Sequence, residues 1–419
     1  MSSPFQRKAL RPFEALIHCG PHHPHVIFNP PASNQTKEFY FYRNYMFKQV
    51  NLNFKTKIME YKLFTPAKVG GIEVKNRIVM SPMTRCRAIG NVPNDLVATY
   101  YGQRAGAGLI VTEGTSPSPN GLGYARIPGI YSKEQVEGWK KVTSAVHANG
   151  GKIFVQLMHT GRISHQLNLP EGARVLAPSA VKPAGQMWTD TQQMQDFPVP
   201  EAMTAEEVQQ TKAEFVTAAK NAIEAGFDGI ELHGANGYLL EQFLSPVSNV
   251  RTDNYGGSIE NRARFVIEVA AAAADAIGKD KIGIRLSPYG VASDMPHYPE
   301  IDATYKYLAE QLNNIGIAYV HVVDHSALGG PIVPLEIKQT IRHAFKNTVI
   351  LAGGYDLERA EADLQSGLGD LIGFGRPFIN NPDLVDRLKN NQPLSQELNM
   401  DLFYSADEKG YCDYPVYSA

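Results

Sequence analysis

Short apolar runs alternate with longer amphipathic runs along most of the chain, starting at Ile78. This alternation is typical of buried parallel strands joined by crossover helices. Eight strands are predicted, most of them rich in Val, Ile and Leu, at residues 78–83, 108–114, 152–159, 227–234, 282–288, 319–324, 349–354 and 371–377. The pattern therefore predicts eight successive β/α units.

Helix signals lie between these strands. Ser132 precedes an amphipathic run, and Thr204 with Glu207 forms a capping box before the segment that reaches residue 225. Gly226 and Gly278 are placed to end two of the helices. Eight such units favour a single-domain (β/α)8 TIM barrel, although an open doubly wound sheet gives a similar pattern, so the motifs must decide between them.

Two segments lie outside this regular pattern. A strand-like hairpin is predicted from residues 61–65 and 72–76, with a turn at Gly70 and Gly71, and we expect it to cover the bottom of the barrel. Residues 1–58 hold eight Lys or Arg against two acids and show no period. We interpret 1–58 as an irregular extension and 59–419 as the catalytic domain.

The basic, acid-poor extension fits a disordered tail, an unused upstream start or an organelle-targeting peptide. It also carries a group of possible metal ligands, which we leave unassigned: His18, Cys19, His22, His23 and His25. No metal site is predicted.

Composition excludes several other classes. Of 419 residues, 43% are hydrophobic and 20% charged, which indicates a globular protein with a large core. The net charge of -2 argues against a nucleic-acid partner. No apolar run is long enough to span a membrane, and three cysteines are too few for a disulfide framework. We expect a cytoplasmic monomer or homodimer that acts on a small molecule.

The active site of a β/α barrel lies where strands hand over to helices. The fourth predicted strand ends in a turn that carries His233, Asn236 and Tyr238. His233 and Asn236 can act as two neutral donors to one carbonyl oxygen, which withdraws electrons from a conjugated alkene. Tyr238 can then supply a proton as a general acid. A lone histidine here would more often be structural, but three such residues in one turn indicate chemistry.

Glycine-rich turns follow the seventh and eighth strands, and they include Gly354, Gly375 and Arg376. Barrels often bind phosphate with these two loops, and an arginine supplies charge and a bidentate fork. Such turns can also merely close a barrel. Two neighbouring turns with an arginine favour a phosphate site.

Two further strand-end residues have two interpretations each. Arg285 lies between apolar residues in a barrel strand and needs an anionic partner, which is either a reduced flavin or an acid on a neighbouring strand. The amide of Gln156 can match the imide edge of a flavin, or it can cap its own loop.

With these motifs in place, residues 59–419 resemble the old yellow enzyme family of flavin-dependent ene-reductases, which includes plant 12-oxophytodienoate reductases and bacterial N-ethylmaleimide reductases. The turn from His233 to Tyr238 resembles the family's substrate and proton-donor motif. The resemblance implies flavin contacts from Pro82, Met83, Thr84, Gly114, Gln156 and Arg285, and phosphate contacts from Gly354, Gly375 and Arg376. A second family signature runs from residue 244 to 262.

The resemblance also describes the mouth of the site. Thr84 matches the family branch that uses threonine beside the flavin, whereas Cys86 lies two positions away from the place where another branch uses cysteine. Residues 161–203, after the third strand, resemble a variable substrate-capping loop, and Phe403 and Tyr404 match aromatic positions near the mouth. Met158 replaces a bulky aromatic of some members, and residues 1–58 have no counterpart in the family.

The implied activity is reduction of an enone or enal C=C bond. NADPH, or less typically NADH, reduces FMN and leaves before the alkene binds. One alternative is a flavin-dependent isomerase on the same barrel, which the proton donor Tyr238 argues against. The other alternative is a barrel binding protein without turnover, which the intact set of motifs argues against.

Overall fold

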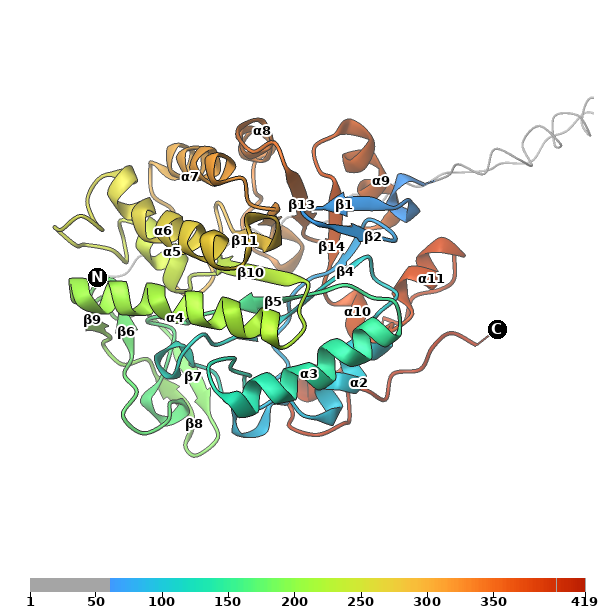
Figure 1. The fold of residues 1–419 in the computed structure, drawn as a ribbon, viewed down its shortest axis with the longest axis horizontal. Coiled ribbons are helices and arrows are strands. Elements are labelled where there is room, and N and C mark those ends of the chain that lie inside the picture. Colours follow the sequence, from blue (N-terminus) through green and yellow to red (C-terminus); the bar gives the residue numbers. More distant parts are fainter. Residues whose placement is uncertain (1–60, 397, 419) are drawn as a thin grey trace, which may run out of the picture. The chain divides into compact units, whose positions relative to one another are not determined.

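The computed structural model describes residues 61–396 and 398–418. Eight parallel strands form a closed barrel in the order β10-β11-β12-β13-β14-β3-β4-β5, which confirms the barrel over the open sheet (Figure 1). The strands are β3 (Ile78–Met80), β4 (Leu109–Thr115), β5 (Ile153–Leu157), β10 (Gly229–Gly234), β11 (Ile282–Leu286), β12 (Tyr319–Val323), β13 (Thr348–Ala352) and β14 (Leu371–Phe374). Most are shorter than predicted, because the chain leaves the barrel ladder before the polar residues that follow each strand.

Helices cover the outside of the barrel, as Figure 1 shows. They are α2 (Asp95–Gln103), α3 (Lys133–Ala148), α4 (Ala205–Glu224), α5 (Leu239–Leu244), α6 (Ile259–Ile277), α7 (Ile301–Ile315), α8 (Leu335–Ala344), α9 (Leu357–Ser366), α10 (Pro377–Asn380) and α11 (Leu384–Lys389). The side chains of Ser132 and Thr204 form the capping boxes of α3 and α4. Gly226 and Gly278 follow α4 and α6 with positive φ angles of 88° and 98°, so both predicted helix ends are confirmed.

The amino-terminal end of the barrel is covered by a hairpin whose first arm differs from the prediction. Strand β1 (Ala67–Val69) pairs with β2 (Ile72–Val74), whereas residues 62–64 form a short 3-10 helix. The predicted strand at 61–65 was therefore wrong. The reason is tertiary: the backbone N–H groups of Lys62 and Leu63 donate to the carboxylate of Glu361 on α9, at 2.9 and 3.2 Å.

Close contact holds this hairpin against the barrel. Val69 and Val74 pack in one apolar cluster with residues near the starts of the barrel strands, including Leu109 and Tyr319. At the turn, Gly70 has a φ of 53°, and a Cβ there would lie 2.0 Å from the carbonyl oxygen of Asp280. Only glycine fits this turn.

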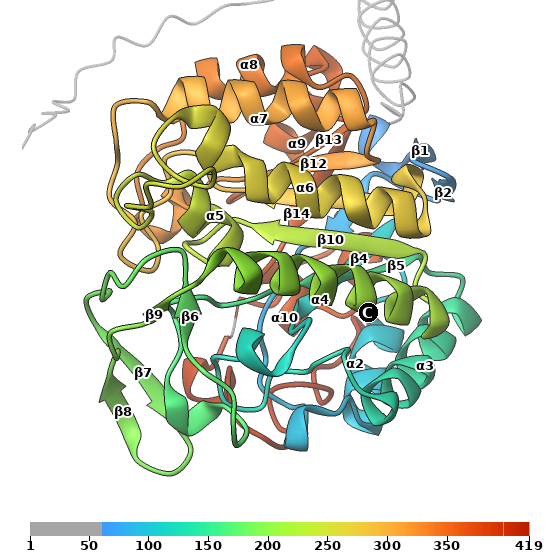
Figure 2. The same ribbon diagram turned by 60° about the vertical axis from the view of Figure 1, so that its left-hand side comes forward.

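A long segment between β5 and α4 lies at the opposite end of the barrel from the β1–β2 hairpin (Figure 2). It contains the antiparallel hairpin of β7 (Gln186–Thr189) and β8 (Gln193–Asp196). It also contains the short parallel pair of β6 (Leu176–Ala177) and β9 (Glu201–Ala202). This segment, residues 161–203, is called the capping segment below.

The predicted extension, residues 1–58, and its histidine and cysteine cluster lie outside the described residues. In the part that the structure describes, no helix is long and apolar enough to cross a membrane. The same residues contain no group of three or more His, Cys, Asp or Glu side chains placed to hold a metal ion.

Candidate active site

A cavity of about 1390 Å³ opens at the carboxyl ends of the barrel strands. It brings together all of the predicted site residues: Pro82, Met83, Thr84, Gly114, Gln156, His233, Asn236, Tyr238, Arg285, Gly354, Gly375 and Arg376. These residues come from strand ends spread over almost 300 positions of sequence, and a closed parallel barrel gathers such ends at one face.

His233 lies near the end of β10, beside Arg285 on β11 in the strand register. Burial, and then the positive charge of Arg285, holds the pKa of His233 well below its usual value. The imidazole is therefore neutral at neutral pH. Its Nδ1 is buried with no hydrogen-bond partner in the described part of the chain, and its ring contacts the ring of Tyr238 edge to face, with centroids 4.8 Å apart.

The turn after β10 is held in place by hydrogen bonds that lead to the buried carboxyl group of Glu241. Asn236 has a φ of 59°, and its backbone N–H donates to Ser287 Oγ at 2.8 Å. The N–H of Gly237 donates to Glu241 Oε2 at 2.6 Å, and Ser287 Oγ donates to Glu241 Oε1 at 2.8 Å. These bonds satisfy the strained turn and set the positions of Asn236 and Tyr238.

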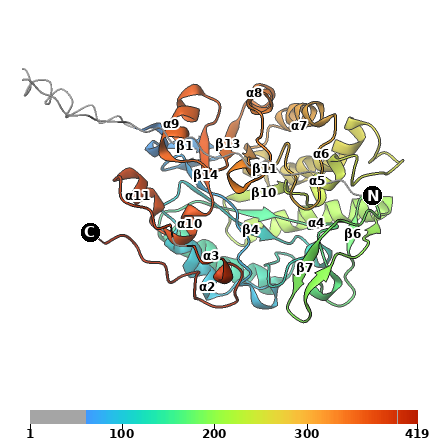
Figure 3. The same cartoon turned by 180° about the vertical axis from the view of Figure 1, so that it is seen from behind.

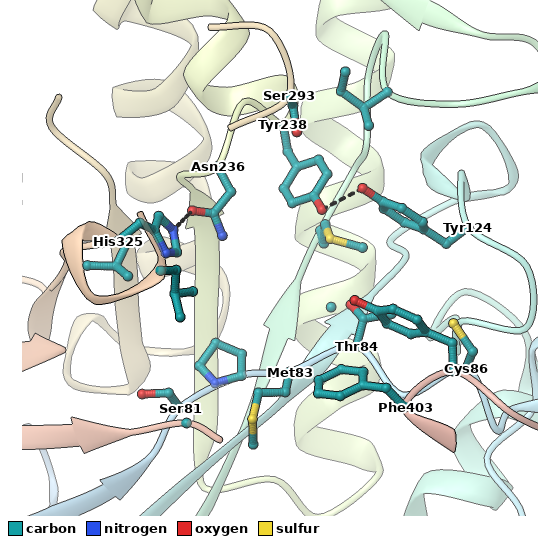
Figure 4. Close-up of a pocket in the computed structure, with 18 of the residues that line it drawn as sticks. Ser81, Met83, Thr84, Cys86, Tyr124, Asn236, Tyr238, Ser293, His325 and Phe403 are labelled. Carbon is teal, nitrogen blue, oxygen red and sulfur yellow. Dashed lines mark hydrogen bonds between the residues drawn. The ribbon is translucent and has the colours of Figure 1, made fainter. Parts of the chain in front are cut away.

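Tyr238 meets a second tyrosine in the cavity. Its hydroxyl oxygen lies 2.9 Å from that of Tyr124, as the dashed line in Figure 4 shows. Burial raises the pKa of Tyr238 to about 12, so the phenol keeps its proton at neutral pH, as a general acid requires. Sequence reasoning missed Tyr124, because it lies in a loop with no period and no strand end beside it.

Asn236 also has an unpredicted partner. His325, two residues after the end of β12, places its Nε2 2.7 Å from Asn236 Oδ1 (Figure 4). The rule that polar residues follow barrel strands would have found His325, had it been applied to the sixth strand as it was to the others.

The floor of the cavity tests the prediction of a flavin. Arg285 Nε is buried without a hydrogen-bond partner, and no acid within the described residues forms an ion pair with Arg285. A direct salt bridge, which was the alternative, is thus not formed within the described residues, although Glu231 on the neighbouring strand β10 is the acid whose charge acts most on Arg285. A buried guanidinium without a partner is costly, and a bound anion or acceptor would satisfy it. A flavin ring edge fits this requirement.

Gln156 is oriented by the same floor rather than capping its own loop. Its Nε2 donates to Glu231 Oε1 at 2.8 Å, and Glu231 Oε2 lies 2.8 Å from His321 Nδ1. Burial alone would raise the pKa of Glu231, but His321 and Arg285 together hold it below its usual value. A charged Glu231 thus holds the Gln156 side chain through its Nε2–H. The amide oxygen of Gln156 is then left to accept a hydrogen bond, as from the imide N–H of a flavin.

The two glycine turns form the proposed phosphate end. Gly354 has a φ of 61°, and a Cβ there would lie 2.4 Å from the side chain of Ala327. At Gly375, a Cβ would have only the sulfur of Met83 within 4 Å, at 3.6 Å, so it would project into the cavity. Arg376, which is exposed, lies next to this opening. Backbone N–H groups beside an arginine suit a phosphate.

The mouth of the cavity is mostly apolar. Met158 fills the space in which a side chain at Gly114 would lie, since a Cβ at Gly114 would be 2.4 Å from its sulfur. Phe403 and Tyr404 also line the cavity, as the resemblance implied, and the capping segment contributes the further wall residues Ile163, Met187, Trp188, Met194 and Phe197.

One side chain joins three parts of this mouth. Arg126 forms an ion pair with Asp190 in the turn of the β7–β8 hairpin, and it donates to the carbonyl oxygens of Tyr404 and Cys86 at 3.0 and 3.1 Å. The capping segment is thereby linked to the C-terminal segment across the entrance.

A closed β/α barrel that gathers glycine-rich turns, a buried arginine and a donor turn at one cavity is the arrangement expected of a flavin-binding oxidoreductase. The chain belongs to the NADH:flavin oxidoreductase / NADH oxidase family, whose model matches residues 62–395. This confirms the resemblance to old yellow enzymes that the motifs indicated.

Similar proteins agree with this assignment. A putative 12-oxophytodienoate reductase 11 from Oryza sativa subsp. japonica is 42% identical over 359 residues, covering 84% of this chain and 97% of the relative. A probable flavin mononucleotide-dependent alkene reductase from Leishmania infantum is 41% identical, with the same coverage of both chains. The solved structure of morphinone reductase matches with a TM-score of 0.82 at 41% identity, covering 86% of this chain and 98% of that one.

Proposed function

We propose that this protein is an FMN-dependent ene-reductase, which reduces the C=C bond of α,β-unsaturated carbonyl compounds with NADPH or NADH as the source of electrons. One observation carries the proposal: a single turn places two neutral donors and a protonated phenol over a cavity whose floor holds an unpaired arginine. Relatives named as alkene and 12-oxophytodienoate reductases support it. A structure of morphinone reductase in complex with tetrahydroNAD supports a nicotinamide donor.

The residues of the turn divide the chemistry between them. His233 and Asn236 donate hydrogen bonds to the substrate carbonyl oxygen and stabilise the negative charge that develops there. When bound, reduced FMN supplies the hydride for the β-carbon. Tyr238 transfers its phenolic proton to the α-carbon, and its raised pKa keeps that proton in place until carbanion character develops.

The other cavity residues would hold the cofactor. Arg285 and Gln156 would bind the polar edge of the flavin ring, and Pro82, Met83, Thr84 and Gly114 would contact the ring and the chain attached to it. Gly354, Gly375 and Arg376 would bind the phosphate. Tyr238 also separates this proposal from a flavin isomerase, which returns its hydride and needs no proton donor for net reduction.

An anaerobic visible spectrum of the purified protein tests the proposal. We expect a flavin band that bleaches with NADPH and returns when cyclohexenone is added. A colourless protein that FMN cannot reconstitute, or a reduced flavin that the enone leaves unchanged, would overturn it.

We further propose that the protein acts in the cytoplasm as a monomer or homodimer. The two cysteines in the described part of the chain, Cys86 and Cys412, are buried and unpaired, which suits a reducing compartment. Cell fractionation and size-exclusion chromatography with light scattering test the two parts separately.

A further inference from the structure

The amide of Asn236 has its oxygen bound before any substrate arrives. His325 Nε2 lies 2.7 Å from Asn236 Oδ1, and Figure 4 shows the amide nitrogen on the other side, away from His325. An amide is planar, so binding its oxygen on one side fixes the direction of its NH2 group. The backbone of Asn236 is fixed as well, by the bond from its N–H to Ser287 Oγ.

His325 is itself held in a rigid turn. Asp324, directly before it, pairs with the buried Lys338 through Oδ2 at 2.7 Å and accepts the N–H of Ser326 on Oδ1 at 2.9 Å. The carbonyl oxygen of His325 accepts the N–H of Leu328 at 2.8 Å. The imidazole is thus presented to Asn236 from a loop whose polar groups are already paired.

The protonation of His325 decides what the contact can do. Burial, and then the positive charge of Arg285, lowers the pKa of His325, while Asp324 acts in the opposite direction. A neutral imidazole has one N–H, and this ring either donates to Oδ1 or accepts from the amide NH2. Only the first arrangement turns the NH2 group toward a substrate carbonyl, because in the second the NH2 group would face His325 and the amide oxygen would face that carbonyl and repel it.

We propose that His325 is a positioning residue for alkene reduction, which holds the Asn236 amide with its NH2 group toward the substrate carbonyl through an Nε2–H to Oδ1 hydrogen bond. The inference rests on the proposed function, since it takes Asn236 as a carbonyl donor. His325 follows β12, the sixth barrel strand in chain order, so it adds to the reaction a residue that lies outside the motif from His233 to Tyr238.

A double-mutant cycle tests this role. Four proteins are compared: wild type, His325→Leu, Asn236→Leu and the double variant. The readout is the second-order rate constant for re-oxidation of the prereduced flavin by cyclohexenone, measured by stopped flow. We expect roughly a tenfold loss in His325→Leu, as for one lost hydrogen bond, and less than a twofold further loss when His325→Leu is added to Asn236→Leu.

Two more variants separate positioning from general damage. His325→Gln keeps an N–H donor of similar reach and should recover most of the lost rate. Ser326→Ala alters the same turn but keeps the backbone N–H that donates to Asp324, so its rate should stay within twofold of wild type. Flavin content, measured from the visible spectrum, checks that each variant is folded.

The outcomes distinguish this inference from the proposed function. A loss in Asn236→Leu with none in His325→Leu overturns the role of His325 alone. Independent, multiplying losses in the double variant also overturn it, because His325 would then not act through Asn236. If Asn236→Leu itself re-oxidises at the wild-type rate, the carbonyl role of Asn236 fails and the inference fails with it.

Discussion

A group of buried arginines behind the C-terminal segment and the single buried arginine at the cavity floor have opposite surroundings. Arg104, just after α2, donates to the carbonyl oxygens of Phe378 and Ile379 at 2.7 Å each and to that of Tyr100 at 2.8 Å. Arg285 at the floor of the cavity is also buried, yet its Nε has no partner in the described residues. Both are buried guanidinium groups, but their hydrogen bonds differ.

The paired group holds the C-terminal segment against the barrel. Arg85 donates to the carbonyl oxygens of Phe403 and Gly410, at 3.1 and 2.6 Å, and Arg87 also bonds to Phe403 at 2.7 Å. Figure 3 shows this segment running past α2 and α10. The difference teaches that a fully paired buried arginine stabilises the fold, whereas an unpaired one lowers the stability of the empty protein and is explained by a ligand.

The largest expected effect concerns a cavity group that should matter for rate and not for stability. Tyr238→Phe removes the proposed proton donor and should slow re-oxidation of the reduced flavin by an enone by about 10² to 10⁴-fold. Reduction of the flavin by NADPH needs no such proton and should change little. Stopped-flow measurement of the two half-reactions checks this, and a comparable loss in both would sink the assignment.

The next effect concerns the paired group. Arg104→Met should lower the free energy of unfolding by about 3 kcal/mol, because several buried carbonyl oxygens lose their donor. Denaturant unfolding measures the change. Lys141→Met, which removes an exposed ion pair with Asp95, is the control and should cost less than about 0.5 kcal/mol. If the two variants are equally stable, the paired arginines do not stabilise the fold.

Arg285→Met should have the opposite effect to Arg104→Met: it should weaken FMN binding without lowering the stability of the fold. The dissociation constant of FMN should rise on the order of a hundredfold, which corresponds to about 2.7 kcal/mol. The apoprotein should be about as stable as wild type, because the Nε of Arg285 has no hydrogen-bond partner in the described residues and the substitution removes a buried donor that lacks an acceptor. Flavin fluorescence titration and thermal unfolding of the apoprotein measure the two quantities. A destabilised apoprotein with unchanged FMN affinity would break the comparison.

The smallest effect concerns Glu113, a buried acid that accepts the backbone N–H of Arg85 on Oε2 at 3.1 Å while its Oε1 has no partner in the described chain. Burial raises the pKa of Glu113 to about 7, partly offset by hydrogen bonds from the backbone of Arg85 and Cys86. The folded protein therefore holds this proton more tightly than the unfolded chain. The stability from this group is complete below about pH 4.5 and is lost as the pH rises through about 7.

Glu113→Gln cannot lose a proton, so it should remove this dependence. Between pH 5 and pH 8 the free energy of unfolding of the wild type should fall by about 2 kcal/mol relative to the variant. Denaturant unfolding of both proteins at the two pH values measures the difference. An equal pH slope in the two proteins would show that Glu113 is already ionised when folded.

Local patterns in the sequence determined the barrel strands, the capped helices and the turn that carries His233, Asn236 and Tyr238. Runs of Val, Ile and Leu, capping boxes and strand-end motifs depend on residues close together in the chain, so they are readable before folding. The glycine-rich turns with Gly354, Gly375 and Arg376 could be predicted in the same way, since they too depend on residues close together in the chain.

Only the tertiary structure decided which groups meet across the chain and which are left without a partner. Residues 62–64 form a 3-10 helix and not a strand because Glu361, 298 positions from Leu63, binds their backbone. Tyr124 reaches Tyr238 across 114 positions, and His325 reaches Asn236 across 89. Whether Arg285 Nε finds a hydrogen-bond partner likewise depends on the side chains that all the neighbouring strands place around it. No local pattern encodes such distances, because barrel closure brings these side chains together.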